Sequence, residues 1–334
     1  MRIGGNRKWA NRIGLALVAS SLMTGCSTTE PTPAPAPTSA TKPMPMPMPK
    51  NLTRQDAIAW ARGIDPCALI DRDKLAALGT IRAFGTASSP TSCAAHMDDG
   101  SDRGVDVDWA IAFTPTDFLI TPLGTLTEID GTRIRQIDSA SALPPEARGQ
   151  RVESACSIDI PFENDIAVRM SVSMARDRKA CTSGEPLVRA VLSKWPSQPA
   201  QGSSPNTTVT ALTRTAPCAV VPELQKVPGL VFDWKDQSLD SCFFKRGGTD
   251  LLVSFNYRTR ELATVNAQPT AFGGHPGYTA TDRGTTTATA IVGDEFSGVG
   301  AGHERRLVPV VEVSGDNPAA VSDVMAAVLA QLPT

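Results

Sequence analysis

The stretch Asp65-Pro66-Cys67-Ala68-Leu69-Ile70 recurs further along the chain as Ala216-Pro217-Cys218-Ala219-Val220-Val221. Each copy is followed by a short helical pattern of apolar residues that ends at a glycine, Gly79 in the first copy and Gly229 in the second. Self-similarity of this kind is the mark of a duplicated structural unit. The sequence therefore predicts two domains of the same fold.

The segments that follow agree in both copies. A second cysteine comes next in each, Cys93 and Cys242, just before a stretch in which every second residue is apolar. Such a period of two is typical of a strand with one buried face. The alternating apolar residues are Val105, Val107, Trp109, Ile111 and Phe113 in the first copy and Leu251, Val253, Phe255 and Tyr257 in the second.

Both copies also end alike, in an apolar segment of helical pattern before a proline. Residues 190–195 precede Pro196, and residues 327–332 precede Pro333. Because the strands run consecutively and do not alternate with helices, the class is α+β. We expect two similar domains, each an antiparallel sheet of about five strands with an N-terminal and a C-terminal helix on one face and the other face partly open.

This repeat sets the expected domain boundaries. The first domain covers residues 51–196 and the second 213–334, joined by a Ser/Pro/Thr-rich linker at 197–212. Residues 273–278 occupy the place of residues 131–135 in the first copy. We therefore interpret Gly273-Gly274 as the turn into a strand.

The first 50 residues indicate export and lipidation. Residues 1–25 have a basic start, an apolar run too short to span a bilayer and small residues before Cys26, as in a bacterial lipoprotein signal peptide. A lipidated Cys26 would anchor the chain to the extracytoplasmic face of the cell membrane. An ordinary cleaved signal with a free Cys26 is the alternative. The Pro-rich residues 26–50 are expected to form a disordered tether.

The charge balance argues against nucleic acid as a partner. The chain has 32 basic and 34 acidic residues, and removal of residues 1–25 takes away four basic ones, which leaves a net charge of about −6. Nucleic acids and anionic lipid surfaces attract clustered Lys and Arg. The expected partners are the membrane, through the lipid anchor, and a protein or the wall of the envelope.

Six further cysteines belong to the predicted mature domains. Fifteen connectivities are open to six cysteines, but the equivalent places of the cysteines in the repeat favour one of them. The second copy lacks both members of one pair, in the region around Thr289 and at Pro318, as expected for residues bonded to each other. The predicted structural disulfides are Cys67 with Cys93, Cys218 with Cys242, and Cys156 with Cys181.

The opening motif also resembles that of a family. The sequence is similar to actinobacterial cell-envelope lipoproteins of unknown function, whose domain opens on Asp-Pro-Cys-Ala-Leu and reaches a second Cys followed by an aromatic residue. Here the family's motif occurs in two tandem copies. Ala94 follows Cys93 where the family tends to have an aromatic, and Ala216 replaces the Asp in the second copy. The resemblance implies an envelope lipoprotein without an assigned reaction.

A search for catalytic or metal-binding patterns gives no candidate. The three histidines, His96, His275 and His303, lack the spacing of metal ligands. The sequence also contains no nucleotide-binding loop and no nucleophile elbow. The acidic residues 98–102 lack the oxygen spacing of a calcium loop and are interpreted as a hairpin turn. Asp106 and Asp108 should form the outward face of the following strand. We expect no enzyme activity, no metal and no cofactor.

Two functions are consistent with these features. The first is a non-enzymatic binding or scaffolding protein of the cell envelope. The second is a carrier or sensor of a small apolar or glycolipid ligand. An enclosed apolar cavity would favour the carrier, and a flat exposed aromatic patch would favour the scaffold.

Overall fold

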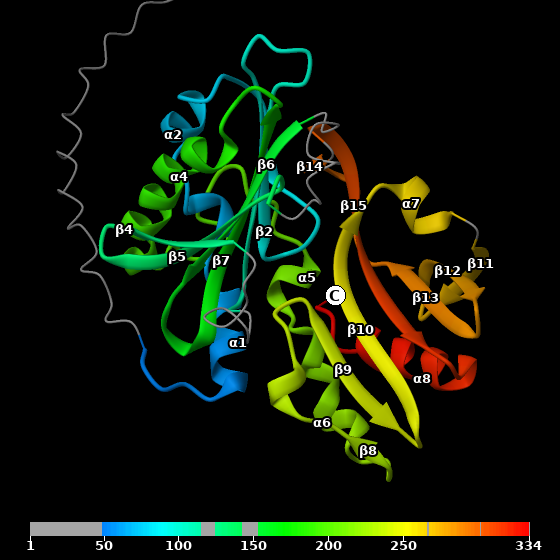
Figure 1. Ribbon diagram of the computed structural model, residues 1–334. Coiled ribbons are helices and arrows are strands. Elements are labelled where there is room, and N and C mark those ends of the chain that lie inside the picture. The colour runs from blue at the N-terminus through cyan, green and yellow to red at the C-terminus, as the bar shows by residue number, and fades with distance from the viewer. Residues whose placement is uncertain (1–48, 115–123, 142–152, 266, 301, 334) are drawn as a thin grey trace, which may run out of the picture. The chain divides into compact units, whose positions relative to one another are not determined.

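The computed structural model describes residues 49–114, 124–141, 153–265, 267–300 and 302–333 (Figure 1). The predicted signal peptide, the lipidation site Cys26 and all but the end of the tether lie outside the described residues. Within the described ranges no helix is long and apolar enough to cross a membrane.

The first copy forms one sheet with the strand order β1-β2-β3-β7-β6-β5-β4, in which each neighbouring pair is antiparallel. The strands are β1 (Thr80–Thr86), β2 (Ser92–Asp98), β3 (Val105–Phe113), β4 (Thr125–Ile129), β5 (Thr132–Asp138), β6 (Glu153–Pro161) and β7 (Ile166–Ala175).

The second copy has the corresponding order β8-β9-β10-β15-β13-β12-β11, again antiparallel throughout, and β14 is an additional strand paired with β15. The strands are β8 (Leu230–Val231), β9 (Ser241–Arg246), β10 (Thr249–Arg258), β11 (Gln268–Phe272), β12 (His275–Asp282), β13 (Thr285–Ile291), β14 (Phe296–Gly300) and β15 (His303–Gly315).

The α+β class and the two sheet domains are confirmed, but the expected sheet size is wrong. The sheets have seven and eight strands within the described residues, not about five. The prediction missed β1 and the segments that carry Cys93 and Cys242, which are strands in their own right. Residues 92–98 contain no Val or Ile and are buried on both faces for most of their length, so the alternating pattern is absent.

The two long C-terminal helices each pack on the core face of their sheet, whereas Ala263 of α7 packs on Val308 and Val310 on the opposite face of the second sheet. In Figure 1, α4 lies along the first sheet, where it contacts β6 and β7, and α8 lies along the second, where it contacts β13 and β15. The first copy contains α1 (Arg54–Arg62), η1 (Pro66–Ala68), α2 (Arg72–Ala76), η2 (Glu163–Asp165), α4 (Ala180–Lys194) and η3 (Trp195–Ser197). The rest of the chain contains α5 (Ala211–Arg214), η4 (Pro217–Val220), α6 (Val221–Leu224), η5 (Trp234–Asp236), α7 (Arg260–Thr264) and α8 (Pro318–Leu329).

Strand register gives the residue-by-residue correspondence of the two copies. Cys93 lies opposite Trp109, which lies opposite Met170 on β7. In the second copy Cys242 lies opposite Val253, which lies opposite Val313 on β15. Trp109 therefore corresponds to Val253, and Met170 corresponds to Val313.

Three disulfides join the helical segments to the sheets in the predicted pairing. Cys67–Cys93 links η1 to β2, Cys218–Cys242 links η4 to β9, and Cys156–Cys181 links β6 to α4. The bond between η1 and β2 thus recurs at the same place in the duplicate. Such links restrict the unfolded chain and so stabilise the fold.

The register also identifies what replaces the third disulfide. Thr286 lies opposite Gly315 in the second sheet, as Cys156 lies opposite Val172 in the first. Thr286 is three residues from Thr289, within the region where the repeat predicted the missing cysteine.

The Asp65 side chain holds the opening motif of the first copy in place. Its fully buried carboxylate accepts hydrogen bonds from the backbone N–H of Cys67 (2.9 Å) and Ser204 (2.8 Å) and from the hydroxyl of Thr207 (2.6 Å). The segment expected to be a linker, 197–212, is therefore held against the first copy. Ala216 occupies the corresponding position in the second copy and has no such side chain.

Candidate ligand-binding site

The alternation of β3, β6 and β7 separates the core face of the first sheet from its open face. Val105, Val107 and Trp109 are buried at 0–1% exposure, as predicted, while Asp106 is half-buried and Asp108 exposed on the opposite face. The predicted outward orientation of the two aspartates is confirmed. Ser157 on β6, and Arg169 and Ser171 on β7, lie on the same open face and are exposed.

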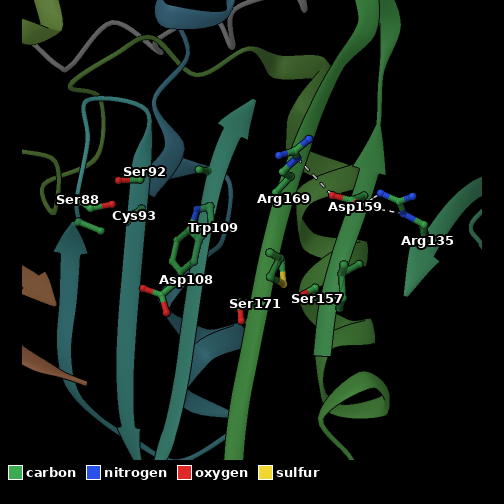
Figure 2. Close-up of a pocket in the computed structure, with 14 residues that line it drawn as sticks. Ser88, Ser92, Cys93, Asp108, Trp109, Arg135, Ser157, Asp159, Arg169 and Ser171 are labelled. Atoms are coloured by element: carbon green, nitrogen blue, oxygen red, sulfur yellow. Dashed lines mark hydrogen bonds and ion pairs between the residues drawn. The ribbon is translucent and has the colours of Figure 1, made fainter. Parts of the chain in front are cut away.

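A hollow of about 440 Å³ lies on this open face and is called the polar hollow below (Figure 2). Its floor is low because the positions between the charged side chains carry Ser or Ala. The polar side chains that line it are Ser88, Ser92, Asp108, Arg135, Ser157, Asp159, Arg169 and Ser171. Its volume lies within the range of small-molecule sites.

An ion cluster occupies one end of the polar hollow. Register places Arg169 opposite Asp159 and Asp159 opposite Arg135. The Arg135 side chain donates to Asp159 Oδ2 from Nε (3.1 Å) and Nη2 (2.9 Å), and Arg169 Nε lies 3.5 Å from Asp159 Oδ1. Figure 2 shows the three side chains in a row. Arg135 is buried and Asp159 half-buried, whereas the Arg169 side chain is 49% exposed.

Asp108 stands apart from this cluster. Solvent reaches its carboxylate, although the protein surrounds it on most sides as part of the floor of the hollow. This partial desolvation, with a smaller contribution from the negative charge of Asp106, raises the pKa of Asp108 from 3.8 to about 6. Both causes raise the pKa. Because solvent reaches the carboxylate directly, water screens part of this increase.

The second copy helps to hold the wall of the polar hollow. The carbonyl of Ser88, in the turn between β1 and β2, accepts a hydrogen bond from the backbone N–H of Tyr257 (2.8 Å). Three residues on, the Thr91 hydroxyl donates to Asp240. Val299 of the β14–β15 hairpin packs on small side chains of β1, β2 and the turn between them, which are Ala83, Ala87 and Ala94.

The second copy does not repeat the chemistry of the hollow. Register places Leu252 at the position of Asp108, Glu312 at that of Arg169, and Thr289 at that of Asp159. Glu312 is already bonded within its own sheet, because Asn256 and Arg258 each donate to its Oε2 at 2.7 Å. The charged arrangement therefore belongs to the first copy alone.

Each of the three histidines lies on a strand. His96 pairs across β2 and β3 with Asp106, with 2.7 Å between Nδ1 and Oδ1. His275 begins β12 after the Gly273-Gly274 turn, and His303 begins β15 after the hairpin from β14. These three side chains come from different places on the two sheets. In the described ranges, no group of three or more His, Cys, Asp or Glu could hold a metal ion.

The acidic segment after β2 forms the predicted turn. Asp98 and Asp99 accept hydrogen bonds from the backbone of Gly100 and Ser101, and Asp99 also pairs with Arg178 at 3.0 Å. These local bonds are those expected of turn-forming aspartates.

Sequence reasoning missed Arg135, Asp159 and Arg169. A signal for Asp159 and Arg169 exists in the polar residues at every second position of residues 157–159 and 169–173. Their meeting depends on the pairing of three strands that are distant in sequence, which the local pattern does not specify.

Comparison with known proteins adds no function. No family model matches the chain, and no curated protein matches it. A solved structure, the di-domain ARO/CYC protein BexL from the BE-7585A biosynthetic pathway, is 12% identical over 72% of this chain and 79% of that chain. Its TM-score of 0.11 is too low to support an inference.

Proposed function

We propose that the chain is a lipid-anchored, extracytoplasmic binding protein of the cell envelope, without enzymatic activity, whose first domain takes its ligand in the polar hollow. The main support for this proposal is the open face of the first sheet, which is lined by charged groups and hydroxyls. The second copy lacks such a face. A fold needs no such face for stability, because the second copy keeps the same strand order with Leu252 and Thr289 in place of two aspartates.

The arrangement supports a ligand-binding protein better than a scaffold. A scaffold would show a flat aromatic patch, but the large hydrophobic side chains exposed among the described residues are all Leu or Val. The second copy supports the site indirectly, through the contacts of Tyr257 and Asp240 with the turn that walls the hollow. This gives the duplication a role, since the first copy binds the ligand and the second copy holds the wall of the binding site in position.

Envelope localisation rests on the lipoprotein-like signal at residues 1–25 and on the disulfides, which form and persist in oxidising compartments. Fractionation of cells that express Cys26→Ala tests the anchor. The variant should leave the membrane fraction for the soluble exported fraction. Retention in the membrane would contradict lipidation.

Hydrogen exchange tests the binding site. The full chain, purified in detergent, is incubated with soluble fragments of the cell wall or with a lipid-free small-molecule extract of the envelope. Protection of β3, β6 and β7 that disappears in Arg169→Gln supports the proposal. Protection confined to the second sheet, or protection unchanged in Arg169→Gln, would contradict it.

A carrier of a small apolar or glycolipid ligand is the second candidate, and one observation favours it. A hollow of about 660 Å³ lies between α7 and the β14–β15 hairpin, with Tyr257, Leu262, Val299 and Leu307 among its lining residues. Leu262 is 60% exposed there. Under this alternative, Leu262→Asp would abolish ligand retention while Arg169→Gln would leave it unchanged.

A further inference from the structure

Two opposite charges on the floor of the polar hollow are not paired with each other. Asp108 lies opposite Ser171, and Arg169 lies opposite Ala110, so the two charged residues are diagonal neighbours on adjacent strands. Residues so placed are about 7–8 Å apart, within reach of long side chains. No ion pair joins them, and Figure 2 shows Asp108 apart from the row formed by Arg169, Asp159 and Arg135.

Both groups retain hydrogen-bonding capacity toward the hollow. The Asp108 carboxylate has no hydrogen bond or ion pair to another described residue. Arg169 donates from Nη2 to the carbonyl of Phe113 (3.1 Å) and approaches Asp159 only at 3.5 Å. A guanidinium has five N–H donors, so most of those on Arg169 remain for a ligand. Arg135 already occupies the other oxygen of Asp159.

The charges on the floor sum to zero. Asp108 and Asp159 are balanced by Arg135 and Arg169, so the hollow attracts neither a simple anion nor a simple cation by net charge. An anion on Arg169 would be repelled by Asp108, and a cation on Asp108 would be repelled by Arg169. A ligand that carries both charges meets complementary groups at both ends, which gives specificity through electrostatic complementarity.

From this geometry we infer that the polar hollow binds a small zwitterion, an amino acid or dipeptide, with its ammonium group on Asp108 and its carboxylate on Arg169. The hydroxyls of Ser157 and Ser171, on the floor beside these charges, supply further donors and acceptors. A volume of about 440 Å³ accommodates a ligand of this size. This inference rests on the proposed binding function of the same hollow and names its ligand class.

The test uses the full oxidised chain in detergent and four alanine-based probes that separate the two charges. L-Alanine and L-alanyl-L-alanine carry both charges, N-acetyl-L-alanine carries only the carboxylate, and L-alaninamide carries only the ammonium group. Saturation-transfer NMR gives affinities for each, and a set of other L- and D-amino acids and dipeptides extends the series. At least one zwitterion should bind at millimolar concentration. Each singly charged analogue of alanine should bind at least about tenfold more weakly.

Two variants assign the ends of the ligand. Asp108→Asn should remove the preference for a free ammonium group, and Arg169→Gln should remove the preference for a free carboxylate. Leu252→Asn, at the position in the second sheet that matches Asp108, is the control and should leave binding unchanged. Each variant is used only if its unfolding midpoint matches that of the unmodified chain and all three disulfides are intact.

The contrary outcomes separate the ligand class from the function. If N-acetyl-L-alanine binds as tightly as the dipeptide and still depends on Arg169, the site is an anion site, so the zwitterion inference fails while the proposed binding function stands. Absence of millimolar binding by every zwitterion also overturns the inference. If, in addition, envelope fragments protect neither β3 nor β7 from hydrogen exchange, the proposed function fails as well.

Discussion

Arg62 and Asp240 join the two copies of the fold, with Arg62 Nη1 2.9 Å from Asp240 Oδ1. Arg62 is buried, and it also donates to the backbone carbonyls of Leu239 (2.6 Å), Leu212 (2.6 Å) and Thr215 (2.7 Å). A single side chain from α1 therefore satisfies three buried carbonyls and one carboxylate of the linker and the following copy. Its hydrogen bonds are charge-assisted and so among the stronger ones in proteins.

Replacing Arg62 with methionine should strongly destabilise the chain. The change leaves a carboxylate and several carbonyls without their donor, and loss of one partner from a buried ion pair costs about 3–5 kcal/mol. Urea unfolding should show a lower midpoint for Arg62→Met. The control is Arg82→Met, which breaks the exposed Arg82–Asp98 pair and should leave the urea midpoint almost unchanged. Equal effects of the two changes would contradict the role of Arg62.

The Asp65 carboxylate should be needed for stability and not for ligand binding. Asp65→Ala removes the acceptor of three hydrogen bonds in a fully buried place. Unpaired buried donors cost about 1–3 kcal/mol each, reduced by any water that enters. Thermal unfolding should show a clear loss of stability, while zwitterion affinity at low temperature stays unchanged. An unchanged melting temperature would contradict this assignment.

The third disulfide should be dispensable for folding. Its counterpart in the second copy is absent, with Thr286 at the place of Cys156, and the sheet order is nevertheless the same. The double variant Cys156→Thr with Cys181→Ala should fold and lose about 3 kcal/mol, as expected for a loop of this length. Its two other disulfides should appear in the intact mass. A variant that fails to fold would show that the first copy depends on this bond in a way the second does not.

Much of the fold follows from the sequence because the signals are local. The motif around Cys67, its copy around Cys218 and the alternation from Val105 to Phe113 specify the duplication, the disulfides and the inward face of β3. β2 gives no such signal. The hairpin of the second copy covers its open face, where Val299 meets Ala94, so both faces are apolar and the period of two is lost.

The candidate site could be predicted only in part. Asp108 is visible as an outward residue of an alternating strand. Its relation to Arg169 depends on the register of β3 with β7, and that of Arg169 to Asp159 depends on the register of β7 with β6. These pairings join residues far apart in the chain. They are set by core packing on the other face of the sheet and not by the polar residues themselves.

Protonation of Asp108 should make stability depend on pH. Its folded pKa is about 6, above the ordinary 3.8, so the folded chain binds more protons than the unfolded chain between these values. The contribution is present below pH 4 and is lost as pH rises through 6. Because solvent reaches the carboxylate, we expect about 1 kcal/mol. Urea unfolding from pH 4 to 8 should show this loss in the parent chain and not in Asp108→Asn. A pH profile identical in both chains would contradict the shift.

Tyr257 should resist ionisation at alkaline pH. It is buried at 3% exposure, and its hydroxyl lies 2.8 Å from Thr210 Oγ1. Burial raises the pKa of this phenol above its usual 10, an effect that the bond with Thr210 offsets only in part. The chain has two tyrosines, so Tyr278→Phe isolates the signal of Tyr257.

Because the folded pKa of Tyr257 is raised, the phenol favours the folded state below pH 10, and this contribution is lost at higher pH. Absorbance at the phenolate wavelength should therefore rise well above pH 10 and together with unfolding followed by circular dichroism. Ionisation near pH 10 with the fold intact would contradict the burial of the Tyr257 hydroxyl.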